Sequence, residues 1–162
     1  MKRYKNKLFA ILLSVFALIS FSSCENYEWR EGTMDYYSTI NTTANGVIAA
    51  NLPIDFNSIL VDGPYNSIDD IRFVGGSIKI EPGPHISGFT LSLSNSNATL
   101  NVDIRSGLGG TLNNYQTQNF LNEVVEVVRR NGYATIYVDG LAEPYARFDL
   151  DFYIDVDAYV RE

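Results

Sequence analysis

The chain has 162 residues, of which 46% are apolar and 19% charged, a composition that predicts one globular domain and excludes a disordered or multi-span membrane protein. Four of the 12 bases precede residue 8, so the chain from residue 24 onward has eight bases against 19 acids, which disfavours both nucleic-acid binding and electrostatic adhesion to membranes. One Cys and one His exclude a Cys/His zinc site, a Cys–His nucleophile pair and a disulfide, and we expect neither a cofactor nor catalysis.

The N-terminus has the three parts of a secretory signal peptide. Bases at positions 2, 3, 5 and 7 precede the apolar segment 8–21, and the small residues Ser22 and Ser23 follow it. The apolar segment has 14 residues, whereas a membrane-spanning helix needs about 20. Residues 1–23 are therefore predicted to be a leader that is removed, with a short signal-anchor helix as the alternative.

The predicted cleavage point carries the only cysteine. Residues 21–24, Phe-Ser-Ser-Cys, resemble the lipobox of bacterial lipoproteins, with Phe21 where Leu is usual, and the Asn- and Tyr-rich chain that follows is similar to Bacteroidetes lipoproteins. The resemblance implies acyl chains on Cys24, the lipid bilayer as a partner and an outer-membrane location. Glutamates within 25–31 favour surface display in that group, but other residues interrupt them, so the surface and the periplasm both stay open. An ordinary signal peptide followed by a free cysteine is the alternative.

Residues 24–33 lack periodicity and are expected to tether the lipidated cysteine to a single domain over 34–162. Within that domain, turns rich in Gly, Pro and Asn recur at short spacing, and apolar and polar residues alternate between them, as in 89–93 and 98–104. The pattern predicts an antiparallel β-sandwich of about seven strands.

The loop at 62–70 gathers four oxygen-bearing side chains, those of Asp62, Asn66, Asp69 and Asp70. They lack the alternating spacing of an EF-hand loop, so they are weak calcium candidates beside the simpler interpretation of a turn with capping acids. We expect no metal site here.

The two strands that flank Asn95 constrain the loop between them. Apolar residues occupy odd positions before the loop, such as Leu91, and even positions after it, such as Leu100. These side chains share one face only if the loop has an even number of residues, either 95–96 or 94–97.

Residues 117–131 change to a helical period, with an apolar stripe that includes Phe120 and Leu121 and with Asn, Glu and Arg opposite it. We predict an amphipathic α-helix over about 117–131, capped by Thr117 and ended by Gly132 in the left-handed conformation. The helix is expected either to bridge the strands near 104 and 134 or to close one end of the sandwich.

Residues 148–160 alternate without a break, which predicts a strand about 43 Å long that bends or runs past its partners. Its polar face carries Asp149, Asp151, Asp155 and Asp157. Two of these carboxylates, with Asp139 from the strand 134–138, are calcium candidates; the simpler interpretation is a solvated face that discourages aggregation.

Several tyrosines are predicted on the polar faces of the last two strands. If 134–138 pairs with 148–152 so that Ile136 faces Leu150, the tyrosines gather on one face beside carboxylates, a surface suited to stacking on sugar rings. Tyr also stabilises sheets without any ligand. The candidate ligand-binding residues are Tyr133, Tyr137, Tyr153, Asp139 and Asp151.

Because no side chains converge as a nucleophile, base and oxyanion donor would, the sequence favours a non-catalytic interaction or structural module of the envelope. Its partner is then an unknown envelope protein. A small glycan-binding surface lipoprotein is the alternative.

Overall fold

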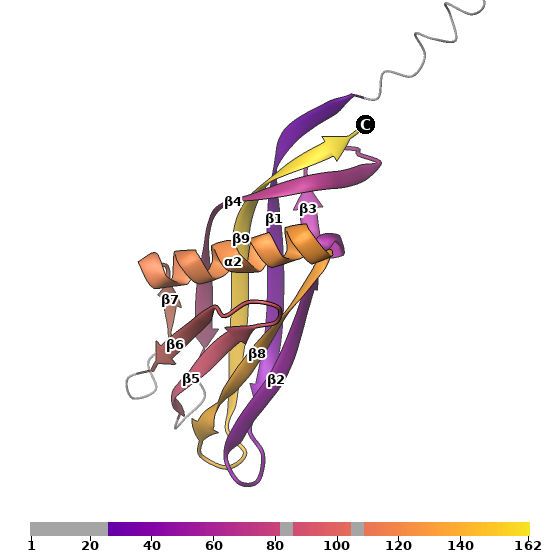
Figure 1. The fold of residues 1–162 in the computed structure, drawn as a ribbon. Helices are drawn as coiled ribbons and strands as arrows, with labels where there is room; N and C mark the ends of the chain where they lie inside the picture. The colour runs from indigo at the N-terminus through magenta and orange to yellow at the C-terminus, as the bar shows by residue number, and fades with distance from the viewer. Residues whose placement is uncertain (1–25, 82–85, 105–108) are drawn as a thin grey trace, which may run out of the picture.

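The computed structural model describes residues 26–81, 86–104 and 109–162, so the leader 1–23 and Cys24 lie outside the described residues. Figure 1 shows the strands and the helix of this part of the chain. In chain order the elements are β1 (Tyr27–Asn41), β2 (Val47–Asp55), the 3₁₀ turn η1 (Phe56–Ser58), β3 (Ile59–Val61), β4 (Ser67–Glu81), β5 (Ile86–Leu93), β6 (Thr99–Asp103), β7 (Gly110–Leu112), α2 (Tyr115–Asn131), β8 (Tyr133–Ala142) and β9 (Arg147–Arg161).

The strands form two antiparallel sheets, which confirms the predicted β-sandwich. One sheet has five strands in the order β3-β1-β9-β4-β7, and the other has four in the order β2-β8-β5-β6. The sequence predicted about seven strands; β3 and β7, at the two edges of the five-stranded sheet, have three residues each. Segments that short show no alternation, so the pattern alone does not reveal them.

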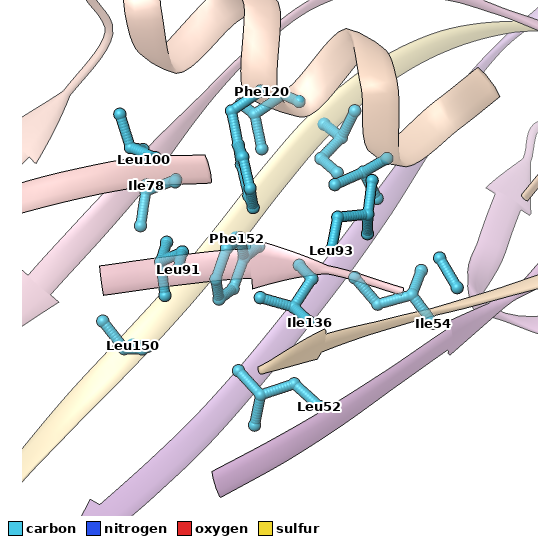
Figure 2. Close-up of a cluster of buried hydrophobic side chains, with 14 of the residues drawn as sticks. Leu52, Ile54, Ile78, Leu91, Leu93, Leu100, Phe120, Ile136, Leu150 and Phe152 are labelled. Carbon is cyan, nitrogen blue, oxygen red and sulfur yellow. The ribbon is translucent and has the colours of Figure 1, made fainter. Parts of the chain in front are cut away.

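The core lies between the two sheets and under the helix (Figure 2). Leu91 and Ile136 of the four-stranded sheet, Phe152 of the five-stranded sheet and Phe120 of α2 point into it, and each is at most 3% exposed. Burial of such side chains contributes about 1.5–3 kcal/mol each relative to leaving them in water. One cluster of buried side chains therefore joins all three layers into a single unit.

Strand β9 is the middle strand of the five-stranded sheet and is paired along both edges. Its even-numbered side chains from Phe148 to Val160 are all at most 1% exposed, and the odd-numbered ones face solvent. It was expected either to bend or to run past its partners, and the second alternative is wrong, because β1 and β4 have 15 residues like β9 itself. Two register shifts in β4, at Ile68/Asp70 and Phe73/Gly75, mark bulges that bend the sheet instead.

Helix α2 closes one end of the sandwich, one of the two positions expected for it. Strands of 15 residues span about 50 Å, whereas the 9 and 10 residues of β2 and β8 span about 30 Å, so part of the long sheet extends past the short one. In Figure 1, α2 crosses the long sheet in this uncovered region. Its 17 residues measure about 25 Å, close to the width of the sheet. No helix among the described residues is both long and apolar enough to cross a membrane.

The helix begins two residues earlier than predicted and its cap is Asn114, not Thr117. The Asn114 side chain accepts the Thr117 N–H at 3.0 Å, and the Thr117 side chain is buried. Asn is the stronger capping residue, and Asn114 has the extended conformation of a cap. The C-terminal prediction is confirmed, because Gly132 has φ of 81° and donates its N–H to the Val128 carbonyl at 2.7 Å.

The segment expected to be a tether is largely strand. β1 starts at Tyr27 and pairs with β9 from its first residue. The alternation of apolar and polar residues did not reveal the start of β1, because the positions that face inward there are Glu28 and Arg30 rather than apolar residues. Arg30 forms ion pairs with Glu28 and Glu162 and donates to the Pro64 carbonyl at 2.9 Å, so its charge is satisfied beside the core.

The β5–β6 hairpin has the predicted even loop. Leu91 faces Leu100, and the Leu93 N–H donates to the Ala98 carbonyl at 3.2 Å, which leaves a four-residue loop over 94–97. Asn95 takes the left-handed conformation with φ of 56°, which Asn tolerates better than most residues.

Gly76 lets α2 approach β4, and this contact is testable. A Cβ at this position would lie 2.5 Å from the Tyr153 carbonyl oxygen and 2.9 Å from Leu121 Cδ1. We predict that Gly76→Ala destabilises the domain by about 1–3 kcal/mol, as overpacking does, measured by urea unfolding.

Gly110→Ala is the matched control, because a Cβ there has no neighbour within 4 Å. It is expected to leave the free energy of unfolding within about 0.5 kcal/mol. Equal effects of the two substitutions would contradict the close packing of β9 and α2 around Gly76.

Candidate functional site

The outer face of the five-stranded sheet is hollowed into an open trough of about 590 Å³. Thr33 of β1 and its register partner Asp155 of β9 lie at its centre, beside Tyr153. Leu60 of β3 and Val74 of β4 line its two sides and are 67% and 60% exposed. These strands are separated by three strand spacings, or about 14 Å, which sets the width of the trough.

The β4 bulge at Phe73/Gly75 is the local reason for one of these sides. A bulge inserts an extra residue and redirects side chains, and here it leaves the apolar Val74 pointing away from the core. The other side depends on the short edge strand β3, which brings Leu60 next to Thr33.

The trough is acidic. The charged residues that line it are Glu31, Asp62, Asp155 and Asp157, and no Lys or Arg lines it. The charge of Asp155 and a hydrogen bond with it raise the pKa of the Tyr153 hydroxyl, so this phenol stays neutral at physiological pH. The site therefore combines negative charge with one aromatic ring and two apolar side walls.

A carboxyl pair lies beyond Tyr153 on the same face. The pair consists of Asp151 and Asp35. One oxygen of the Asp151 carboxyl, Oδ1, is buried without a hydrogen-bond partner. Burial raises the pKa of Asp151, and a hydrogen bond between its carboxyl and Asp35 and the charge of Asp35 raise it further. Lys79 is the register partner of Asp151, but its ammonium pairs with Glu81 at 2.5 Å.

A group of four side chains, which we call the aromatic platform, lies on the same face where β1 begins. The Tyr27 and Tyr159 rings stack with centroids 5.4 Å apart, and Trp29 lies 5.1 Å from Tyr159. The Arg72 guanidinium lies over the Trp29 ring, 3.9 Å from its centroid. Sequence reasoning missed the platform because it assigned 24–33 to a tether, although Tyr27 and Trp29 have the two-residue spacing of a strand face.

The predicted group of tyrosines is not brought together. The group required 134–138 to pair with 148–152, but β8 pairs with β2 and β5, whereas β9 pairs with β1 and β4. Two strands that each have one apolar face can lie side by side or stack face to face, and here they stack across the core. Tyr133 and Tyr137 consequently lie on the outer face of one sheet, and Tyr153 lies on that of the other.

The carboxylates expected to hold calcium are also separated. Asp139 faces Ala49 and Thr90 in the four-stranded sheet, on the opposite side of the molecule from Asp151 and the other β9 aspartates. Within the described part of the chain, no cluster of three or more His, Cys, Asp or Glu side chains has the geometry of a metal site.

The four weak calcium candidates of 62–70 do not form one loop. Asp69 and Asp70 belong to β4, where Asp69 accepts from Ser67 Oγ at 2.8 Å. Arg129 Nε donates to Asp70 at 2.6 Å, and this contact ties the end of α2 to the long sheet. Asp62 lines the trough, and the Asn66 N–H donates to the Arg161 carbonyl.

No family model matches the chain, and no curated protein matches it either. Among the solved structures that are similar to it in fold are three viral proteins. The decameric BFDV capsid protein has 11% identity, a TM-score of 0.43 and covers 82% of this chain and 99% of its own. Desmodium yellow mottle tymovirus has 13% identity and a TM-score of 0.31, with 78% of this chain and 87% of the viral chain covered. The tobacco streak virus coat protein has 13% identity and a TM-score of 0.31, with 76% of this chain and 86% of the viral chain covered. None of these similarities bears on function.

The carboxyl pair leads to a pH-dependent prediction. Because the pKa of Asp151 is raised above its ordinary 3.8, the folded chain binds this proton more tightly than the unfolded chain, so the group costs stability as the pH rises through its folded pKa. We predict that Asp151→Asn raises the free energy of unfolding at pH 7 by about 0.5 kcal/mol and Tm by about 2 °C. The gain should shrink as the pH falls through the raised pKa of the folded state and should be absent below 3.8, the ordinary pKa, where the carboxyl is mostly protonated in both states.

Asp149→Asn is the matched control on the same strand face. A hydrogen bond from Thr39 lowers the pKa of Asp149, so its substitution should lower Tm at neutral pH and lose this effect as the pH falls. The same direction of change in both variants would contradict the assignment.

Proposed function

We propose that this chain is an exported lipoprotein, anchored at the outer membrane through acyl chains on Cys24, whose sandwich is a non-catalytic interaction module. The leader 1–23 and the Phe-Ser-Ser-Cys sequence at 21–24 support the anchor. The trough on the outer face of the five-stranded sheet supports the interaction role.

The trough is better suited to binding than to catalysis. It is lined by carboxylates, Thr33 and Tyr153, with no His, Cys or Lys among its lining residues. An open trough on a sheet does not exclude water, and the catalytic use of a carboxylate depends on desolvation and on a positioned partner.

The partner that fits the trough best is a basic, extended segment of another envelope protein. Four acidic residues line the trough without a base among them, which attracts Lys and Arg side chains from a distance and fixes their register on contact. Leu60 and Val74 offer apolar contact on both sides, and the width of about 14 Å admits one extended chain with its side chains.

Glycan binding is the second candidate, and Tyr153 favours it. This ring is 44% exposed inside the trough and is adjacent to Asp155, so a sugar could stack on the ring while its hydroxyls donate hydrogen bonds to the carboxylate. The site differs from the one expected from the sequence, because Tyr133 and Tyr137 lie on the other sheet.

The anchor is tested by the mass of the mature N-terminus, taken from protein expressed in a Bacteroidetes host and recovered from membranes. We expect a chain that begins at Cys24 and carries acyl chains, and we expect Cys24→Ser to abolish the modification and membrane retention. An unmodified Cys24 or an intact leader would contradict the proposal.

The trough is tested by titration with a nine-residue Lys/Arg peptide and, separately, with an array of bacterial glycans. We expect peptide binding that weakens about tenfold between low and physiological salt, because the contact is electrostatic. Asp155→Asn with Asp157→Asn should abolish binding, whereas Asp103→Asn with Asp139→Asn, which makes the same charge change on the other sheet, should not.

Glycan binding that Tyr153→Ala removes, without peptide binding, would favour the second candidate. If both charge-matched variants weaken peptide binding equally, the trough has no specific role.

A further inference from the structure

The aromatic platform lies where β1 begins, and its first residue, Tyr27, is three positions after Cys24 in the sequence. We propose that this platform contacts the interface of the bilayer that holds the acyl chains of Cys24, and that this contact sets the orientation of the domain on the membrane. The inference rests on the proposed lipid anchor and goes beyond it, because an acyl anchor alone leaves the orientation free.

Chain length limits how far the platform can be from the membrane. Two residues separate Cys24 from Tyr27, so the two Cα atoms lie at most about 11 Å apart. The polar headgroup region on each side of a bilayer is about 5–8 Å thick. An acylated Cys24 would therefore keep the start of β1 within reach of the headgroups.

The fold places the platform at a projecting end of the molecule. The start of β1, the start of β4 and the end of β9 meet there, with Tyr27 and Ser67 both paired to Arg161. Figure 1 shows this end of the long sheet extending beyond α2 and away from the four-stranded sheet.

The chemistry of the platform suits the interface rather than water or hydrocarbon. Tyr27 and Trp29 are 40% and 39% exposed although they stack on Tyr159, so ring area remains available for contact. Tyr and Trp have apolar rings with a polar group and concentrate at membrane–water interfaces. The Arg72 guanidinium over Trp29 adds a cation that can pair with lipid phosphate.

The nearby charges are arranged so that the contact stops at the platform. Glu28 and Glu162 form ion pairs with Arg30, which reduces their repulsion from phosphates. Glu31 and its register partner Asp157 come next along the face and begin the acidic trough. Carboxylates resist transfer into the interface, so the trough stays in water while the platform is inserted.

Trp29 is the single tryptophan of the chain, so its fluorescence reports the platform directly. The experiment uses the full acylated protein in vesicles of phosphatidylcholine brominated near the headgroup. We expect the Trp29 emission to shift to the blue and to be quenched at least about twofold relative to unbrominated vesicles, as for a ring at the interface.

The matched control moves the reporter along the same face of the same strand. In the variant Trp29→Phe with Tyr37→Trp, the single tryptophan lies eight residues further along β1, or about 27 Å away. We expect no quenching there, and circular dichroism melting checks that the variant is folded. Absence of quenching at Trp29, or equal quenching at both positions, would overturn the inference.

Failure of the lipid anchor can be separated from failure of this inference. If mass analysis shows that Cys24 is not acylated, the mature chain can be coupled to a maleimide lipid through Cys24, its single cysteine, and the quenching measured again. Quenching of Trp29 in the coupled protein keeps the inference although the anchor proposal has failed. An acylated protein with unquenched Trp29 keeps the anchor and rejects the platform contact.

Discussion

The burial of one face of β9 along its whole length is the constraint on which the other features depend. Fifteen residues with alternate side chains removed from water need neighbours of equal length on both edges, which β1 and β4 supply. A five-stranded sheet of this length cannot be covered by strands of 9 and 10 residues, so α2 has to complete the apolar cover. Gly76 and the bulges in β4 accommodate the helix where the second sheet ends.

The trough on the outer face of the same sheet is acidic because the few arginines of the chain make contacts elsewhere in the fold. Arg30 joins β1 to the C-terminus and to the 62–66 loop, Arg129 joins α2 to Asp70, and Arg72 covers Trp29. Each of these guanidinium groups thus has a contact within the fold. The acids of the trough are left without a base among the lining residues, an arrangement that favours a cationic ligand there.

The proposed anchor, the platform and the trough follow one another along the sequence of β1 and the residues before it. Cys24 precedes the platform by a few residues, the platform precedes Glu31, and Glu31 begins the trough. Because β1 rises about 3.3 Å per residue, the centre of the trough lies roughly 13–20 Å beyond the platform. A domain held in this way presents the trough to soluble or surface partners rather than to the bilayer.

Local patterns in the amino-acid sequence are enough to identify the apolar faces, because alternation and helical periodicity depend only on residues close together in the chain. The sandwich class, the long strand at 148–160, the helix, its Gly132 end and the even loop at 94–97 all followed from such patterns. The pairing of the strands could not be read from these patterns, since two strands with one apolar face each bury it equally well side by side or across a core. This choice separated Tyr133 and Tyr137 from Tyr153, and Asp139 from Asp151. The charged residues on the inward face of β1 are paired with each other and with Glu162, which is distant in sequence, and the bulge that exposes Val74 exists only in the pairing of β4 with β9. For that reason the platform and the trough could not be predicted from the sequence.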